Sequence, residues 1–181
     1  ESLKKNFALP VKPINLNGFK DTVDFNYGIW KKNNVRSHKV SGHSIVNISL
    51  TKLGTAPGDA TSEQMRILAK LADEFSSGEI RTTKRQTIVF PFVRKDQVFD
   101  LWKSLEQYDL SSPHQGTLAQ IVACPGRDYC DLAKAVSIPI ATRVQERFND
   151  MNRLLDIGDL NINISGCENS CAHHHIADIG L

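Results

Sequence analysis

Four cysteines are the residues of this chain with the clearest chemical potential, and they lie in two tight pairs. Five residues separate Cys124 from Cys130, three separate Cys167 from Cys171, and there is no further cysteine. A [4Fe–4S] cluster is held by four cysteine thiolates, which are soft anionic ligands that suit iron. Two short-range pairs brought together by the fold would supply these ligands with none left over. The spacing therefore predicts an iron–sulfur cluster site.

Two other uses of four cysteines have to be weighed. A structural zinc site can be built from four thiolates, but its paired ligands usually have two to four residues between them, a range that excludes the first pair. Disulfides belong to exported proteins, whereas residues 1–30 hold no apolar signal core. We therefore expect a cytoplasmic location, and zinc stays open as the weaker alternative.

Length and composition describe ordinary globular material. Of the 181 residues, 40% are hydrophobic and 23% are charged, and no run approaches the roughly eighteen apolar residues of a membrane span. The formal net charge of +2 gives no sign of a dedicated nucleic-acid surface. We expect neither a membrane nor a nucleic acid among the partners of this chain.

Hydrophobic periodicity predicts the elements that lead up to the cysteines. Apolar residues alternate with polar ones over residues 44–51, which predicts a strand with one buried face. Thr61 and Gln64 have the spacing of a capping box, and apolar residues at helical spacing follow them. A helix is therefore expected over residues 62–75.

Two further strands and a second helix follow. The strands are expected over residues 79–83 and 86–92, with the second ending near Pro91, and the helix over residues 95–107. The resulting order β-α-β-β-α predicts a layer of helices on a sheet, which is the α+β class. Residues 1–36 are instead polar and rich in Pro, Asn and Gly, so we expect an irregular N-terminal arm or linker there.

The organisation changes after Leu110. Apolar residues recur at helical spacing between residues 141 and 155. The helix that they predict has Pro139 in its first turn and Gly158 as its expected C-cap. A strand is expected over residues 160–164, and it leads into the second cysteine pair. The residues after Cys130 are expected to open a helix, whose N-terminal dipole would favour the thiolate.

The cysteine segments also resemble a known family. ACPGRDYC at residues 123–130 and SGCENSCAHHHIADIGL at residues 165–181 are similar to the sirohaem-ligating region of the assimilatory nitrite and sulfite reductases. Segments that begin at Ser41, Ala56 and Gly78 resemble the ferredoxin-like half-domain that precedes the cysteines in that family. The resemblance covers roughly residues 37–181.

The resemblance implies a domain organisation. It divides the chain into an arm or linker at residues 1–36, a ferredoxin-like half-domain at 37–112 and a truncated sirohaem/[4Fe–4S]-binding α+β domain at 113–181. Only one copy of the half-domain motif is present, although the family carries two similar halves. We therefore expect a second-half fragment of a larger reductase.

The resemblance also implies two cofactors and their ligands. A [4Fe–4S] cluster would be held by Cys124, Cys130, Cys167 and Cys171, and Cys171 would in addition be the axial ligand of sirohaem iron. Sirohaem carries many carboxylates, which Arg and Lys pair well. The resemblance assigns that contact to a basic segment that contains Arg81, Lys84, Arg85 and Gln86. On the residues alone, the same charges could equally be the solvated face of a hairpin.

Three consecutive histidines follow the last cysteine. Adjacent side chains of an extended segment alternate between two faces, so His173, His174 and His175 cannot all converge on one metal ion. A hydrogen bond to the cluster or to a sirohaem carboxylate is the favoured role for one of them. Their individual roles stay open.

The function implied by the resemblance is the multi-electron reduction of sulfite to sulfide or of nitrite to ammonia, with a ferredoxin or a flavoprotein as electron donor. The family's lysine-rich substrate loop is not found here, so we expect this fragment to be inactive without the rest of the parent reductase chain. Two alternatives stay open on the residues alone. One is an iron–sulfur electron-transfer module without sirohaem, and the other is a structural domain with zinc on the four cysteines.

Overall fold

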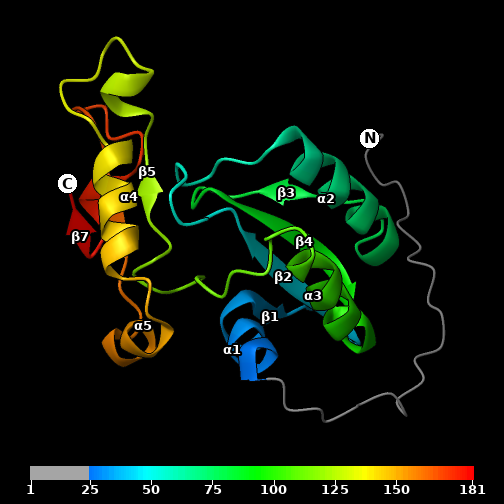
Figure 1. Cartoon of the computed structure of the whole chain (residues 1–181). Helices are drawn as coiled ribbons and strands as arrows, with labels where there is room; N and C mark the ends of the chain where they lie inside the picture. Colours follow the sequence, from blue (N-terminus) through cyan, green and yellow to red (C-terminus); the bar gives the residue numbers. More distant parts are fainter. Residues whose placement is uncertain (1–24) are drawn as a thin grey trace.

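The computed structural model describes residues 25–181, which form two units joined by a segment without helix or strand (Figure 1). The first unit comprises residues 25–110 and the second comprises residues 117–181, and each has its own hydrophobic core. Residues 1–24, the larger part of the expected N-terminal arm, lie outside the described residues. No helix within residues 25–181 is long and apolar enough to cross a membrane.

The first unit is built on a four-stranded antiparallel sheet with the strand order β1-β2-β4-β3. The alternation predicted from the sequence is present in the second strand, where Val46 and Ile48 are buried and Ile45 and Asn47 are half-buried, although Ser49 at its end is also buried. The bounds of the strands are β1 Val35–Ser37, β2 His43–Ser49, β3 Arg81–Thr82 and β4 Thr87–Arg94.

Strand β4 continues through Pro91, although the sequence placed the end of the strand there. Val46 of β2 pairs with Phe90, but Ser44 pairs with Val93, so two residues of β4 oppose one residue of β2 at this point. Proline has no N–H for the ladder, and a bulge is one of the places where a sheet tolerates that loss. The predicted end was wrong because the bulge accommodates the proline.

Two helices pack on the sheet of the first unit. Helix α2 (Ser62–Phe75) begins with the predicted capping box, in which the Gln64 backbone N–H donates to Thr61 Oγ1 at 3.1 Å and the Thr61 N–H donates to Gln64 Oε1 at 3.0 Å. A short 3-10 turn, η2 (Lys95–Gln97), leads into helix α3 (Val98–Glu106). The α+β class is therefore confirmed.

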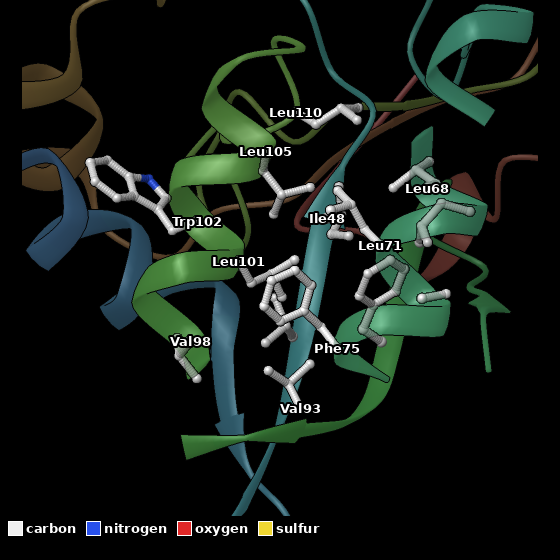
Figure 2. Packing of buried hydrophobic residues seen from close by; sticks show 14 of the residues in the cluster. Ile48, Leu68, Leu71, Phe75, Val93, Val98, Leu101, Trp102, Leu105 and Leu110 are labelled. Carbon is white, nitrogen blue, oxygen red and sulfur yellow. The ribbon is translucent and has the colours of Figure 1, made fainter. Parts of the chain in front are cut away.

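The core of the first unit lies between these helices and the sheet. Figure 2 shows Leu68 and Phe75 of α2 and Leu101 of α3 around Ile48 of β2. Leu68, Leu101 and Ile48 are fully buried, and Phe75 is 6% exposed. This core holds β4 and the turn that precedes it in a fixed position.

Residues 25–37 differ from the irregular arm expected there. They form helix α1 (Phe25–Asn34) and strand β1, and Trp30 is fully buried. The Tyr27 ring packs edge-on against Phe99, with ring centroids 5.0 Å apart, and in a tilted arrangement against Trp102, with centroids 5.3 Å apart. Tyr27 and Trp30 are three residues apart, which is a helical spacing, but two residues are too short a pattern to indicate a helix in a stretch rich in Asn.

The second unit contains a three-stranded parallel sheet in the order β5-β6-β7. Helix α4 packs beside β5 (Figure 1), and a second helix, α5, follows it in the crossover from β5 to β6. The bounds of the elements are β5 Val122–Ala123, α4 Ile138–Arg147, α5 Met151–Ile157, β6 Ile162–Ile164 and β7 Ile179–Gly180, with 3-10 turns η3 Gly126–Asp128 and η4 His174–Ile176.

The helical stripe predicted over residues 141–155 is interrupted. Helix α4 ends at Arg147, and Asp150 starts α5 by accepting a hydrogen bond from the Arg153 N–H at 2.8 Å. Asp is a strong N-cap residue, so it opens a new helix where the apolar period alone would continue the old one. Pro139 in the first turn of α4 and Gly158 as the C-cap of α5 are as predicted.

The segment after Cys130 forms turns and not the expected helix. The Ala133 N–H donates to the Cys130 carbonyl at 3.1 Å, while the next two N–H groups donate to the carbonyl of Gly166. These long-range bonds take the donors that helix continuation would use. No helix dipole therefore acts on Cys130.

Candidate functional site

The two cysteine pairs follow neighbouring parallel strands. Ala123 of β5 is paired with Ile164 of β6, and the Cys124 N–H donates to the Ile164 carbonyl at 3.0 Å. Cys167 comes three residues after Ile164. Because the carboxyl ends of parallel strands meet at one edge of a sheet, both cysteine loops begin side by side at that edge.

The two loops are interlocked through Gly166. Its N–H donates to Cys124 Sγ at 3.1 Å, and its carbonyl accepts from the N–H groups of Lys134 at 2.8 Å and Ala135 at 3.0 Å. A Cβ atom at position 166 would lie 2.8 Å from the Ala135 oxygen and 3.0 Å from Gly126 Cα. Only glycine fits this approach, so the residue type at position 166 is explained by the contact between the loops.

Ser137, at the start of α4, is a further residue of the site. It is fully buried, and its hydroxyl donates to the Cys124 carbonyl at 2.6 Å and lies 3.5 Å from Cys124 Sγ. Burial alone would raise the pKa of the Cys124 thiol, but hydrogen bonds from Ser137 and from backbone N–H groups, including that of Gly166, lower that pKa below its ordinary value. Nothing in the local sequence pattern marks Ser137, because its contact spans 13 residues.

The other three thiols lie on the turns of the two loops. The Cys130 N–H donates to the Gly126 carbonyl at 2.9 Å, Cys130 and Cys167 are half-buried, and Cys171 is exposed. All four cysteines are free thiols. Within residues 25–181, no three His, Cys, Asp or Glu side chains are placed together as a metal site. The fold thus brings the loops to one edge without gathering the thiols into one ligand set.

The histidines differ in conformation from the extended segment that the sequence suggested. His173 has a left-handed backbone with φ +56° and its carbonyl accepts from Asn163 Nδ2 at 3.2 Å. His174 and His175 belong to η4, and their ring centroids are 3.9 Å apart. Two of the three rings are therefore neighbours instead of lying on alternate faces.

The four residues of the basic segment have separate surroundings. Arg81 of β3 pairs with Glu79 at 2.6 Å, and Lys84 is exposed in the turn between β3 and β4. Arg85 and Gln86 instead reach the second unit, where Arg85 donates to the Asn161 side chain and Gln86 binds the backbone of Ala123. The solvated-hairpin alternative therefore describes Arg81 and Lys84 but not the other two.

Comparison with known proteins gives the family. Residues 51–108 match the model of the nitrite/sulfite reductase ferredoxin-like half domain. Over 138 residues the chain is 31% identical to sulfite reductase (ferredoxin) 2 of Mycolicibacterium paratuberculosis. The matched segment covers 73% of this chain and 25% of that protein. This chain belongs to the nitrite and sulfite reductase family.

Other members of the nitrite and sulfite reductase family give the same picture. The chloroplastic ferredoxin–nitrite reductase of Spinacia oleracea is 30% identical, over 74% of this chain and 22% of that protein. The structure of the Mycobacterium tuberculosis NirA protein superposes with a TM-score of 0.62 at 28% identity, over 81% of this chain and 26% of the other. The chain thus spans about a quarter of the length of these reductases.

Proposed function

We propose that this chain is the part of a nitrite or sulfite reductase that holds a [4Fe–4S] cluster and forms one wall of a sirohaem pocket. The observation that carries the proposal is the start of both cysteine loops at the carboxyl edge of the β5–β6 pair, locked together through Gly166. The reductase relatives support the reaction class. In this proposal the domain boundary near residue 112 falls in the segment between α3 and β5.

The residues present fit an iron–sulfur cluster by the chemistry of their donor set. All four cysteines are free, and thiolates are the ligands that such clusters require. The Gly166 N–H on Cys124 Sγ is the kind of contact to a ligand sulfur that adjusts a cluster's reduction potential. When bound, the cluster and sirohaem supply the electron storage and the anion-binding iron that multi-electron reduction needs.

The chain's own residues would act by binding and orienting. Cys124, Cys130, Cys167 and Cys171 would hold the cluster, and Cys171 would also ligate the sirohaem iron, because it is the exposed thiol of the four. Lys84, exposed at the tip of the β3–β4 turn, and Arg81 are the cations that remain to pair with sirohaem carboxylates. A cytoplasmic location, where thiols stay reduced, belongs to the proposal.

Anaerobic reconstitution with iron and sulfide tests the cluster. Wild-type protein should gain about four irons per chain with a broad brown absorption, and each Cys→Ser variant should lose iron. Asn169→Ala, an exposed change within the second loop, is the matched control and should bind iron as the wild type does. Full iron retention in any one Cys→Ser variant would remove that cysteine from the ligand set. Stoichiometric zinc with no iron uptake would favour the structural zinc domain.

The finer parts of the proposal need the longer reductase. Sirohaem adds strong visible bands, so their absence beside a reconstituted cluster would favour an electron-transfer module without sirohaem. Steady-state reduction of sulfite and of nitrite, with ferredoxin and with a flavoprotein as donors, would decide the substrate and the partner. Cys171→Ser should abolish the magnetic coupling between cluster and haem, because oxygen is a poor substitute for a bridging thiolate. A retained coupled signal would assign the bridge to another cysteine.

A further inference from the structure

Strand β5 lies at the edge of its sheet, with β6 on one side only. The N–H and C=O of one residue in a strand point to the same side, and successive residues alternate. Because the Cys124 N–H points to β6, the N–H and C=O of Ala123 point to the open edge. Ala123 is buried, with 3% of its surface exposed, so water does not replace a hydrogen-bond partner there.

The side-chain amide of Gln86 meets both of these backbone groups. Gln86 Nε2 donates to the Ala123 carbonyl at 2.7 Å, and the Ala123 N–H donates to Gln86 Oε1 at 3.1 Å. This two-bond pairing reproduces what one residue of an added strand would supply. Gln86 therefore closes the edge of β5 one residue before Cys124.

The first unit is shaped to hold Gln86 in this position. Gln86, directly before β4, has a left-handed backbone with φ +55°, and its N–H donates to the Thr83 carbonyl at 3.1 Å. A Cβ atom on Gly58 would lie 2.8 Å from Gln86 Cβ, and Gly58 has φ +89°. The turn between β3 and β4 points toward β5 (Figure 1). The position of this side chain is thus fixed by its own turn and by the loop before α2.

Neighbouring contacts join the turn between β3 and β4 to the second unit near both strands that lead into the cysteine loops. Arg85 donates to the Asn161 side chain just before β6, and Asn161 donates to Asp178 through its N–H at 2.8 Å and Nδ2 at 2.9 Å. Gln120 Nε2 donates to the Arg85 carbonyl at 3.3 Å. The turn is therefore attached to the second unit at two points. Gln86 bonds to Ala123 of β5, and Arg85 bonds to Asn161, just before β6.

We propose that Gln86 is a positioning residue, which fixes Cys124 by pairing with the Ala123 backbone. The proposal rests on the proposed function in one respect, namely that Cys124 is a cluster ligand. The hydrogen-bond pairing itself is independent of any cofactor. The two parts can therefore be tested separately.

The test compares Gln86→Leu and Gln86→Glu with Gln107→Leu and Gln107→Glu, which change an exposed glutamine that has no side-chain hydrogen bond in the described structure. Hydrogen exchange of the cluster-free protein reports the Ala123 amide. Its protection factor should fall about tenfold in Gln86→Leu, a size expected for a lost hydrogen bond, and should be unchanged in the Gln107 variants.

Gln86→Glu adds a signature that a change of packing would not give. An ionised carboxylate accepts from the Ala123 N–H but cannot donate to the Ala123 carbonyl, whereas a protonated carboxyl can do both. Protection at Ala123, compared with Gln107→Glu at each pH, should match the wild type below the pKa of the introduced carboxyl and fall above it. Loss of protection that is independent of pH, or no loss in Gln86→Leu, would overturn the pairing.

Positioning of Cys124 is read in two further ways. In cluster-free Gln86→Leu, the alkylation rate of Cys124 relative to Cys171, mapped by mass spectrometry, should change severalfold. In reconstituted protein, iron should be lost faster than from the wild type. Unchanged alkylation together with unchanged iron loss would overturn the positioning role. Failure of the wild type to take up iron would instead refute the proposed function and leave the exchange and alkylation results as evidence for Gln86.

Discussion

The backbone N–H of Gly166 donates a hydrogen bond to the sulfur of Cys124 at a distance of 3.1 Å. This bond joins the start of one cysteine loop to the first cysteine of the other, and it forms between protein atoms alone. The Gly166 carbonyl accepts hydrogen bonds from the backbone N–H groups of Lys134 and Ala135. Part of the candidate site is therefore organised by the chain before any metal binds.

Gly166→Ala should destabilise the protein by about 1–3 kcal/mol, the usual cost of overpacking. The added methyl would lie 2.8 Å from the Ala135 oxygen, so one loop must move. Urea denaturation measures the effect. Gly28→Ala is the control, because nothing lies within 4 Å of a Cβ there and the site is helical, so that variant should be stabilised by about 0.5–1 kcal/mol. Equal stability of Gly166→Ala and wild type would contradict the interlock.

Ser137→Ala should raise the pKa of the Cys124 thiol in the cluster-free protein, because the hydroxyl can turn its one proton from the Cys124 carbonyl to the sulfur when the thiolate forms, which favours the thiolate. Alkylation of Cys124 as a function of pH measures this shift. The lost bond to the Cys124 carbonyl should also cost about 1 kcal/mol of stability. Ser104→Ala, which removes an exposed bond within α3, is the control and should leave the Cys124 titration where it is. An unchanged midpoint in Ser137→Ala would argue against a contact between the hydroxyl and the sulfur.

Trp30→Ala should destabilise the first unit by about 3–5 kcal/mol, because the indole is fully buried between α1 and the core. Trp30→Phe should cost much less than Trp30→Ala, since the buried indole N–H has no hydrogen-bond partner in the described structure. Phe25→Ala, at a side chain that is 68% exposed, should have almost no effect. Thermal unfolding of the three variants measures the differences. A small effect of Trp30→Ala would mean that α1 is not part of the first unit.

The free energy of unfolding should decrease at acidic pH because of His114. Burial lowers the pKa of this imidazole, while a hydrogen bond with the Thr51 backbone opposes that shift. The unfolded chain, with a His pKa near 6.5, then binds a proton before the folded protein does. The free energy of unfolding therefore decreases as the pH falls from about 6.5 through the lower folded pKa.

Denaturation of wild type and His114→Gln at several pH values checks this dependence. The variant should lack the loss between about pH 6.5 and the folded pKa. His38→Gln, at a partly exposed histidine, is the control for the His→Gln change itself. Parallel curves for wild type and His114→Gln would show that other groups cause the acid loss.

Local patterns predicted much of the first unit. The alternation in β2 is a pattern of successive residues, and the capping box joins Thr61 to Gln64, three residues later. Both features can therefore be recognised in a short stretch of sequence. The bulge at Pro91 and the burial of Trp30 depend on distant partners, and periodicity does not contain them. The break between α4 and α5 was missed although Asp150 is a strong N-cap residue, because the apolar period continued across it.

The candidate site divides in the same way. The four cysteines were identified by type and spacing, and the placement of Cys167 after a strand agrees with the structure. The surroundings of Gln86, Ser137 and Gly166 could not be predicted, because their contacts span 37, 13 and 42 residues. Hydrogen bonds over such separations are decided by how distant segments of the chain pack against each other.

The parallel pairing of β5 with β6 has a consequence for how the protein is made. Gly166 lies 42 residues after Cys124, and the crossover through α4 and α5 must be complete before the two strands can meet. Closing such a loop costs conformational entropy, and proteins rich in contacts of long sequence separation fold more slowly. A chain emerging from the ribosome therefore carries Cys124 and Cys130 as an unmatched pair until the second pair has been synthesised. If the four cysteines hold a cluster as proposed, its assembly must follow the synthesis of Cys171.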